Sequence, residues 1–467
     1  MTTLIRGRFV LTSSDAGMLR DAAVLVDGVA IREVGAWDDL RARHPSVAVV
    51  GDGTGIVLPG LVNTHGHFSE GLITGMGETL TLLEWIQRLI VPVAPHLTRE
   101  MARVGTLLKG AEMIASGVTA VNDLFVCSPR PHDPVTPGVV DGLERLGLRG
   151  EVAFGASDLA DPRPVEEILA EHDALAAAAA GSRRCRFRLG IATVLAQSDA
   201  LFAASVRRTH DEGWRVHTHF HEVREEVVAS RQAHGLTTIA YAARSGLLDA
   251  EVLGAHCIWL TDADIELLAE HGVRVAHNPV ANMILGSGVC PVRRLQAAGI
   301  PVGIGTDGPA SNDGQDMLEA MKTAALLQKV SNLDPTAMTA PEVLRMATLD
   351  GARALGLDDV TGSLEVGKDA DVVLLDGRSP ALAIIHDPYQ AVLYCTNGRE
   401  VSDVWVQGER VLEAGRLTRV DIDAVVDEAR ELAEELVSAA GLRDAPHASH
   451  LVGRPGAGRA ATAGAGA

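Results

Sequence analysis

The chain has 467 residues, of which 47% are hydrophobic and 22% charged, and this composition excludes an intrinsically disordered protein. Its 41 basic and 61 acidic residues give a formal net charge of -20, which excludes nucleic acid and anionic membranes as principal partners. Met1 to Val10 contains no sustained apolar run, so we expect a cytoplasmic protein. The five Cys form no Cys-x-x-Cys pair, which argues against a thiolate metal site.

Short apolar runs separated by turn residues occupy the first 59 residues and predict a small β unit. The same pattern of short apolar runs and turn residues occurs over 361–420, where Gln407-Gly408 marks a turn between two strands. We therefore expect residues 1–59 and 361–420 to build one β-sandwich domain from both chain ends.

Residues 60–360 alternate apolar, β-rich segments with helical patterns. Eight candidate strands end near His65, Asp123, Gly155, Val194, His219, His256, His277 and Asp307. This alternation predicts an α/β fold, a closed (β/α)8 barrel. An open doubly wound sheet is the alternative, but no Gly-x-Gly-x-x-Gly turn follows an early strand. Residues 421–445 predict a C-terminal helix, and the Ala-, Gly- and Arg-rich end of 446–467 predicts a flexible tail.

His65-Gly66-His67 follows an apolar strand, and residues two apart on a strand face the same side. Alone this pair is weak, because 17 His in 467 residues give about 0.6 such pairs by chance. A second cluster, His217 to Glu222, ends another strand, and Asp307 ends a third. Three imidazoles and a carboxylate suit Zn²⁺ or Fe²⁺ better than Mg²⁺ or Ca²⁺.

Several motifs together resemble the amidohydrolase superfamily, in particular the cytosine-deaminase-like subgroup that includes S-adenosylhomocysteine deaminases and triazine hydrolases. The likeness runs from the first strand to about Gln407. It rests on Pro59-Gly60-Leu61-Val62-Asn63 before His65-Gly66-His67, on His219-x-x-Glu222, on His256-Cys257, on Gly305-Thr306-Asp307-Gly308 with Ser311-Asn312, and on Gly362 to Asp371.

The resemblance implies roles for individual residues. The expected metal ligands are His65, His67, His219 and Asp307, and the expected catalytic groups are Glu222, His256 and Asp307. Three substrate contacts are expected on other grounds: His217, because strand alternation puts it on the same side as His219; Ser311, which could instead form a turn; and Trp85, in a possible lid or interface helix over 80–91. One divalent ion is expected, Zn²⁺ first and Fe²⁺ second, because the fourth strand has no Lys to bridge two metals. The resemblance also implies a homo-oligomer. His221 is assigned a structural or solvent-facing position, and His277 either lines the mouth of the site or is a hydrogen-bonded core residue.

The implied function is hydrolytic deamination of an amino-substituted N-heterocycle such as a purine, pyrimidine, pterin or triazine. Two alternatives stay open: displacement of chloride or an alkylamine from a triazine-like ring, and a metal-free binding protein of the same fold. The family's adenosine-type deaminases carry a His-Ala-Pro segment after the fourth strand, whereas this chain has Ile191 to Ser198 there. That departure weakens a nucleoside assignment.

Overall fold

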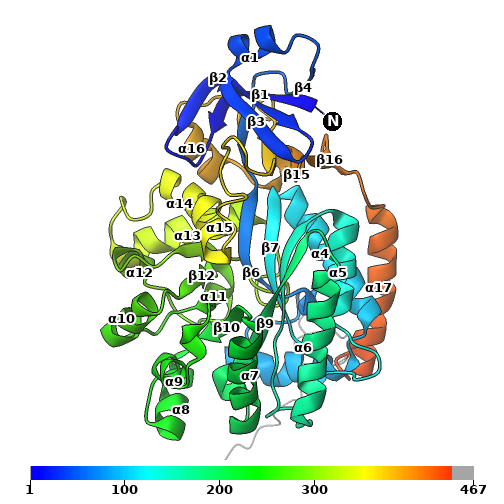
Figure 1. Cartoon of the computed structure of the whole chain (residues 1–467), viewed down its shortest axis with the longest axis vertical. Coiled ribbons are helices and arrows are strands. Elements are labelled where there is room, and N and C mark those ends of the chain that lie inside the picture. The colour runs from blue at the N-terminus through cyan, green and yellow to red at the C-terminus, as the bar shows by residue number, and fades with distance from the viewer. Residues whose placement is uncertain (1, 444–467) are drawn as a thin grey trace, which may run out of the picture.

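The structure is a computed structural model that describes residues 2–443. It contains a parallel barrel and, above it in Figure 1, a sheet domain made from both chain ends. The predicted α/β barrel fold is therefore confirmed. The predicted tail over 446–467 lies outside the described residues.

The barrel has eight neighbouring parallel strands. They are β6 (Leu61–Gly66), β7 (Val118–Phe125), β8 (Arg149–Phe154), β9 (Cys185–Thr193), β10 (Val216–Phe220), β11 (Val252–His256), β12 (Arg274–His277) and β13 (Val302–Ile304). Every residue of β7 and β8 is buried, as expected for strands covered on both faces. A parallel bridge between Gly66 and Asp307 brings the first and last strands together.

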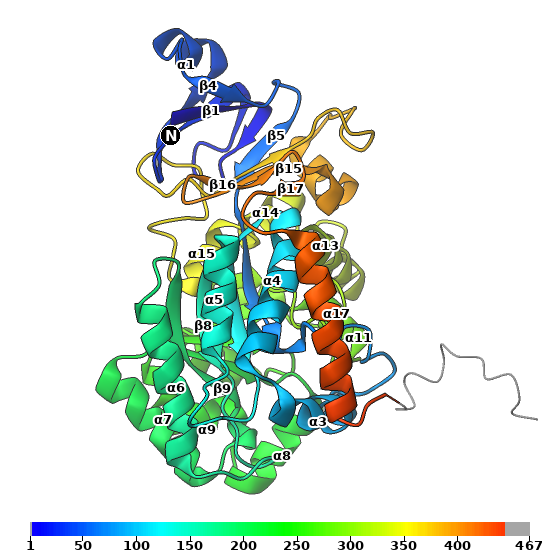
Figure 2. The same cartoon turned by 90° about the vertical axis from the view of Figure 1, so that its right-hand side faces the viewer.

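Helices surround the barrel and connect its strands (Figures 1 and 2). Thr98 and Ser198 cap the starts of α4 and α7 by accepting a backbone N–H with their hydroxyls. The longer helices are α4 (Arg99–Ala115), α5 (Pro137–Leu146), α6 (Val165–Ala180), α7 (Asp199–Glu212), α8 (Arg224–His234), α10 (Asp262–Glu270) and α13 (Met317–Asn332). The shorter ones are α9 (Thr238–Arg244), α11 (Pro279–Ile284), α12 (Val292–Ala297), α14 (Ala340–Met346) and α15 (Leu349–Leu355).

The second sheet joins residues from the two ends of the chain. Its strands run in the order β17-β16-β15-β14-β5-β1-β2-β3, with β4 paired to β1. From the start come β1 (Thr2–Leu11), β2 (Met18–Asp27), β3 (Ala30–Ala36), β4 (Ala48–Val50) and β5 (Ile56–Pro59); from the end come β14 (Val372–Leu375), β15 (Val401–Val406), β16 (Glu409–Glu413) and β17 (Arg416–Leu417). Because β5 leads directly into β6, the sheet is attached at the start of the barrel strands.

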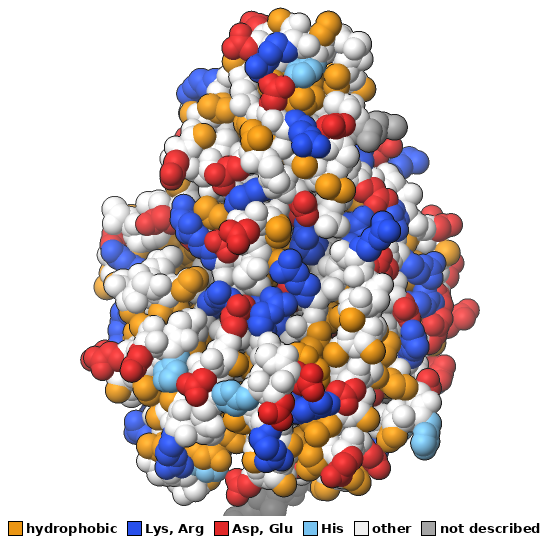
Figure 3. Space-filling model, viewed as in Figure 1, with side chains coloured by type: hydrophobic (Ala, Val, Ile, Leu, Met, Phe, Trp, Pro, Cys, Tyr) orange, Lys and Arg blue, Asp and Glu red, His pale blue; other side chains and the backbone are white. Residues whose placement is uncertain are grey.

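The last described helix, α17 (Ile422–Ala439), lies along α4 on the outside of the barrel (Figure 2). Acidic, basic and apolar side chains are interspersed over the face in Figure 3. Within residues 2–443, no helix combines the length and apolar character needed to cross a bilayer.

Candidate active site

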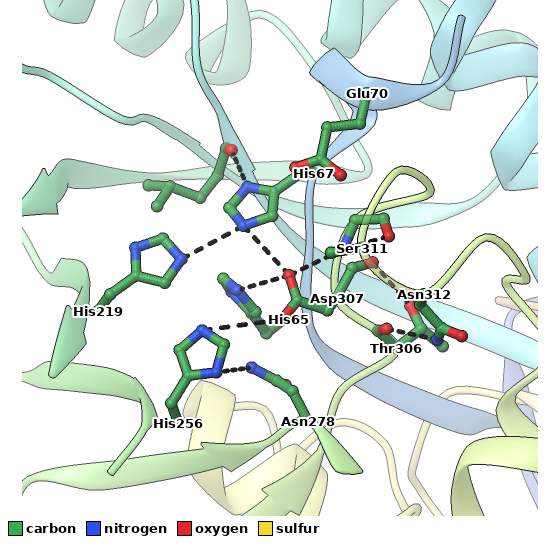
Figure 4. Close-up of polar contacts among 12 residues, drawn as sticks. His65, His67, Glu70, His219, His256, Asn278, Thr306, Asp307, Ser311 and Asn312 are labelled. Atoms are coloured by element: carbon green, nitrogen blue, oxygen red, sulfur yellow. Dashed lines mark hydrogen bonds and ion pairs between the residues drawn. The ribbon is translucent and has the colours of Figure 1, made fainter. Parts of the chain in front are cut away.

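The predicted metal ligands meet where the barrel strands end (Figure 4). His65 and His67 come from β6, His219 from β10, and Asp307 follows β13. Parallel barrel strands present their carboxyl ends at one rim, so residues far apart in sequence converge there. Closure of the barrel brings Asp307 next to His65, because the Asp307 N–H donates to the His65 carbonyl at 2.9 Å.

The ligand atoms lie at distances that suit one shared cation. The Nε2 atoms of His67 and His219 are 3.2 Å apart. Asp307 Oδ1 lies 3.4 Å from His67 Nε2 and 3.5 Å from His65 Nε2. Nitrogen atoms of His65, His67 and His219 all lie within 4.8 Å of one another.

The hydrogen bonds behind two of these rings fix their tautomers. His67 Nδ1 lies 2.6 Å from the Leu124 carbonyl, and His219 Nδ1 contacts the Ala192 carbonyl. Because a carbonyl only accepts, both Nδ1 atoms carry the proton, and both Nε2 atoms present lone pairs. Two lone pairs and a carboxylate oxygen face one another, an arrangement that a metal cation satisfies.

Burial keeps the histidines in the form that binds metal. It lowers the pKa of His65 to about 4 and also lowers the pKa values of His67 and His219. Neutral imidazole is the metal-binding form, so the three rings are ready to ligate at pH 7. Among the described residues, His65 Nε2 has no hydrogen-bond partner. The donor set therefore fits one Zn²⁺ or Fe²⁺ ion.

Two of the predicted site residues have left-handed backbone conformations. His256 has φ 69° and Asp307 has φ 67°, values uncommon for residues other than glycine. Both occur at the end of a barrel strand, where the turn aims each side chain toward the ligand cluster. Such conformations cost about 1–3 kcal/mol each and persist where surrounding contacts hold them.

His256 and Glu222 form the other side of the site. His256 Nε2 lies 3.4 Å from Glu222 Oε2 and 3.7 Å from Asp307 Oδ2. The other ring nitrogen of His256, Nδ1, lies 2.9 Å from the Asn282 side-chain oxygen and 3.4 Å from the Asn278 side-chain nitrogen (Figure 4). The shorter contact is to an acceptor, which favours a proton on Nδ1 and a lone pair on Nε2. Burial, followed by the Asp307 charge, raises the pKa of Glu222 well above its usual value. This shift favours the protonated form of the Glu222 carboxyl.

The site contains a further buried carboxyl group that the sequence interpretation missed. Glu70 lines the same cavity, and its Oε2 accepts the Ala310 N–H at 2.9 Å. Burial and the Asp307 charge raise its pKa well above the usual value. Gly308 leaves space for this carboxyl, because an added Cβ would lie 1.9 Å from Glu70 Oε2. Glu70 follows His67 by three residues, and that spacing is the only signal in the sequence.

The three predicted substrate contacts have different positions. Trp85 and Ser311 line the cavity, and Trp85 Nε1 donates to the Ala310 carbonyl at 2.9 Å. His217 does not line it. Its Nε2 lies 3.0 Å from His65 Nδ1, on the far side of that ligand. His221 and His277 are buried outside the cavity lining, and their ring nitrogens have no hydrogen-bond partner among the described residues.

The cavity has a volume of about 490 Å³, enough for a heterocycle with a substituent. The His67, His219, His256 and Asp307 side chains line its base. Residues 56–411 match the model of the amidohydrolase family.

The chain belongs to the amidohydrolase family.

This amidohydrolase is similar along nearly its whole length to proteins of known name. It is 41% identical to the 5-methylthioadenosine/S-adenosylhomocysteine deaminase of Desulforudis audaxviator, an alignment that covers 94% of this chain and 99% of that protein. The zinc-bound adenosine deaminase of Xanthomonas campestris superposes with a TM-score of 0.87 at 32% identity, covering 93% of this chain and 98% of that one. The zinc complex of atrazine chlorohydrolase from Arthrobacter aurescens TC1 superposes with a TM-score of 0.84 at 28% identity, covering 92% and 100%.

Proposed function

We propose that this amidohydrolase is a metal-dependent deaminase that hydrolyses the exocyclic C–N bond of an amino-substituted N-heterocycle. One observation carries the proposal: Glu222, His256 and Asp307 converge beside three neutral imidazoles at the base of a cavity of ligand size. The names of two similar proteins, both deaminases of adenosine-type compounds, support it.

His65, His67, His219 and Asp307 would hold one divalent ion. When bound, that ion supplies the Lewis acidity that makes water nucleophilic at neutral pH. Zinc in two structural neighbours supports Zn²⁺, and Fe²⁺ is the other candidate.

Asp307 and His256 prepare the nucleophile. The Asp307 carboxylate, whose Oδ2 lies 3.7 Å from His256 Nε2, accepts a proton from the attacking water. His256 Nε2, fixed as an acceptor by the Asn282 contact, orients the remaining O–H. The water oxygen then bonds to the ring carbon that bears the amino group.

Glu222 completes the proton balance. It donates its proton to the ring nitrogen next to the attacked carbon, so negative charge does not build up on the ring. Asp307 returns the water proton to the amino group, the C–N bond breaks, and ammonia leaves. The hydroxyl proton of the intermediate passes to Glu222, which restores the acid and leaves a ring carbonyl with a protonated ring nitrogen.

The test is ammonia release from the zinc-loaded protein over a panel of aminated purines, pyrimidines, pterins and triazines. We expect at least one compound to give stoichiometric ammonia and the corresponding oxo product. Failure of the whole panel with metal-replete protein would contradict the proposal.

A second candidate is displacement of chloride or an alkylamine from a triazine ring. The similarity to atrazine chlorohydrolase and the apolar character of the cavity wall favour it. Chloride or alkylamine release from a substituted triazine, without ammonia, would select this reaction. The convergent acid-base groups argue against the third alternative, a metal-free binding protein.

Four finer assignments complete the proposal. We propose that the protein is cytoplasmic and forms a homo-oligomer. We propose the following domain boundaries: 1–59 and 361–420 for the β-sandwich, 60–360 for the barrel and 421–445 for the C-terminal helix. We also propose that Trp85 and Ser311 contact the heterocycle, since both side chains line the cavity.

A further inference from the structure

We propose that the cavity selects heterocycles whose substituent is uncharged and apolar, and rejects those that carry a phosphate or carboxylate group. This inference rests on the proposed function and deepens it by naming the substrate class. It follows from the charges at the cavity wall, from the apolar side chains there and from the contacts of two arginines in the wall loops.

Apart from its histidines, the ionisable side chains that line the cavity are all acidic. Among the described residues that line it, none is Lys or Arg. The acidic residues in the lining are Glu70, Asp161, Glu222, Glu225, Glu226 and Asp307. Its histidines, His67, His219 and His256, lie at the base, where two of them belong to the metal-ligand cluster. An anionic group placed away from the base would therefore meet carboxyl groups and no cation.

Apart from its ionisable residues, most of the side chains that line the cavity are apolar. One wall comes from the segment between α2 (Leu82–Trp85) and α3 (Val91–Val93), which contributes Leu82, Ile86 and Ile90. The facing wall comes from loops that follow β7, β8 and β9 and contributes Val126, Ala160 and Leu195. These side chains offer no hydrogen bonds to replace the hydration of a charged group.

Two arginines, Arg130 and Arg163, belong to the loops of this wall, and each is already held by another group of the protein. Arg163 Nε pairs with Asp161 at 2.8 Å. Arg130 donates to the Pro95 carbonyl at 3.2 Å. The Asp161 carboxylate, which lines the cavity and accepts the Ser128 hydroxyl, therefore already opposes the Arg163 charge. Neither guanidinium is among the cavity lining.

These features act together on a substituent. An apolar group gains by leaving water, whereas a phosphate or carboxylate loses its hydration without gaining a salt bridge. A buried ion without a partner is strongly disfavoured, so the wall discriminates by charge more than by size.

The test compares three adenine nucleosides in the zinc-loaded protein. 5′-Methylthioadenosine is neutral, adenosine-5′-carboxylic acid carries a carboxylate without an ammonium group, and adenosine 5′-monophosphate carries a phosphate. We measure kcat/KM from ammonia release and binding constants by calorimetry. The neutral compound should exceed both charged compounds by about 10²-fold or more in kcat/KM and in affinity.

A charge-introducing variant sharpens the test. Ala160 is exposed at the cavity wall, so Ala160→Arg should raise the relative kcat/KM and affinity for the two anionic compounds by about tenfold. Ala297→Arg, at an exposed position of α12 outside the cavity lining, is the matched control and should leave the ratio unchanged.

The outcomes separate the two proposals. Equal kcat/KM or equal affinity for neutral and anionic compounds overturns the charge selection, as does a preference for the anions. If Arg130→Ala abolishes carboxylate binding, the rim supplies the cation and the selection is likewise overturned. If none of the three compounds releases ammonia, the calorimetric affinities still decide the selection, and the wider panel of heterocycles decides the deaminase.

Discussion

His217 Nε2 lies 3.0 Å from His65 Nδ1, so the two rings share one proton and His217 orients a proposed metal ligand. Replacing His217 with Gln removes this ring contact. We expect the apparent zinc affinity to fall by about 10- to 100-fold, the usual effect of losing the group behind a ligating histidine. Competition with a chelator measures it.

His221→Gln is the control, since His221 is buried at the end of the same strand but lies outside the cavity lining. Its zinc affinity should stay near wild type. If His217→Gln instead raises KM while metal affinity is unchanged, His217 contacts substrate and does not support the metal.

The ligand set predicts one metal ion per chain, because three imidazoles and one carboxylate complete a single set of protein ligands. The double change His65→Ala with His67→Ala should abolish both bound metal and turnover. Elemental analysis of wild type and variant measures the stoichiometry. Two ions per active chain would contradict the prediction.

Glu222→Gln should lower kcat by about 10² to 10⁴-fold, the usual contribution of a positioned acid or base, with metal content near wild type. The amide keeps the size and the Ser287 contact but cannot transfer a proton. Glu225→Gln, an exposed carboxyl at the same cavity, is the control and should change kcat by less than about threefold. A metal-replete Glu222→Gln protein with normal ammonia release would exclude acid-base catalysis.

Gly308→Ala should disturb the site through Glu70, because the new Cβ would overlap the carboxyl. We expect kcat/KM to fall by about tenfold or more. Combining Gly308→Ala with Glu70→Ala should cost less than the sum of the two single effects, since the overlap is gone. Strict additivity in this double-mutant cycle would show that Gly308 acts independently of Glu70.

A buried histidine far from the metal ligands makes stability depend on pH. His172 packs edge-on against Phe154 and Phe187, and burial lowers its pKa from 6.5 to about 3. The unfolded chain binds the proton first as pH falls below 6.5, so the folded state loses stability between pH 6.5 and 3. At pH 5 this loss is about 2 kcal/mol.

His172→Leu removes the titrating ring, so its unfolding free energy should fall less than that of wild type between pH 8 and pH 5. Urea titrations at both pH values measure the difference. An equal loss of stability in the two proteins would show that His172 stays accessible to protons in the folded state.

The sequence predicted the parts of the fold that depend on local pattern. Each barrel strand was marked by an apolar run, and the ligands stood at the ends of three such runs, so convergence followed from the barrel itself. No comparable sequence pattern shows how deep inside the barrel a given side chain lies. Strand alternation places His217 on the same side as His219, but one residue pair lower, about 6.6 Å along the strand. At that depth the His217 ring contacts His65 and does not line the cavity.

Glu70 shows a second limit of sequence interpretation. Its residue type and position resemble a solvent-exposed loop acid, and only the packing of Gly308 and the Ala310 N–H brings its carboxyl into the cavity. These contacts join segments separated by 240 residues. A single sequence contains no local pattern that records such a pairing.

The sheet made from both chain ends also constrains how the protein is made. Strand β5 lies between β1 and β14, and the β5–β14 ladder pairs Ile56 with Leu375 and Pro59 with Val372. During synthesis, the edge of β5 that receives β14 therefore stays open until more than three quarters of the chain has emerged from the ribosome. An open apolar strand edge invites pairing with other chains. A nascent chain interrupted after the barrel but before β14 would hold every proposed metal ligand and still be prone to aggregate.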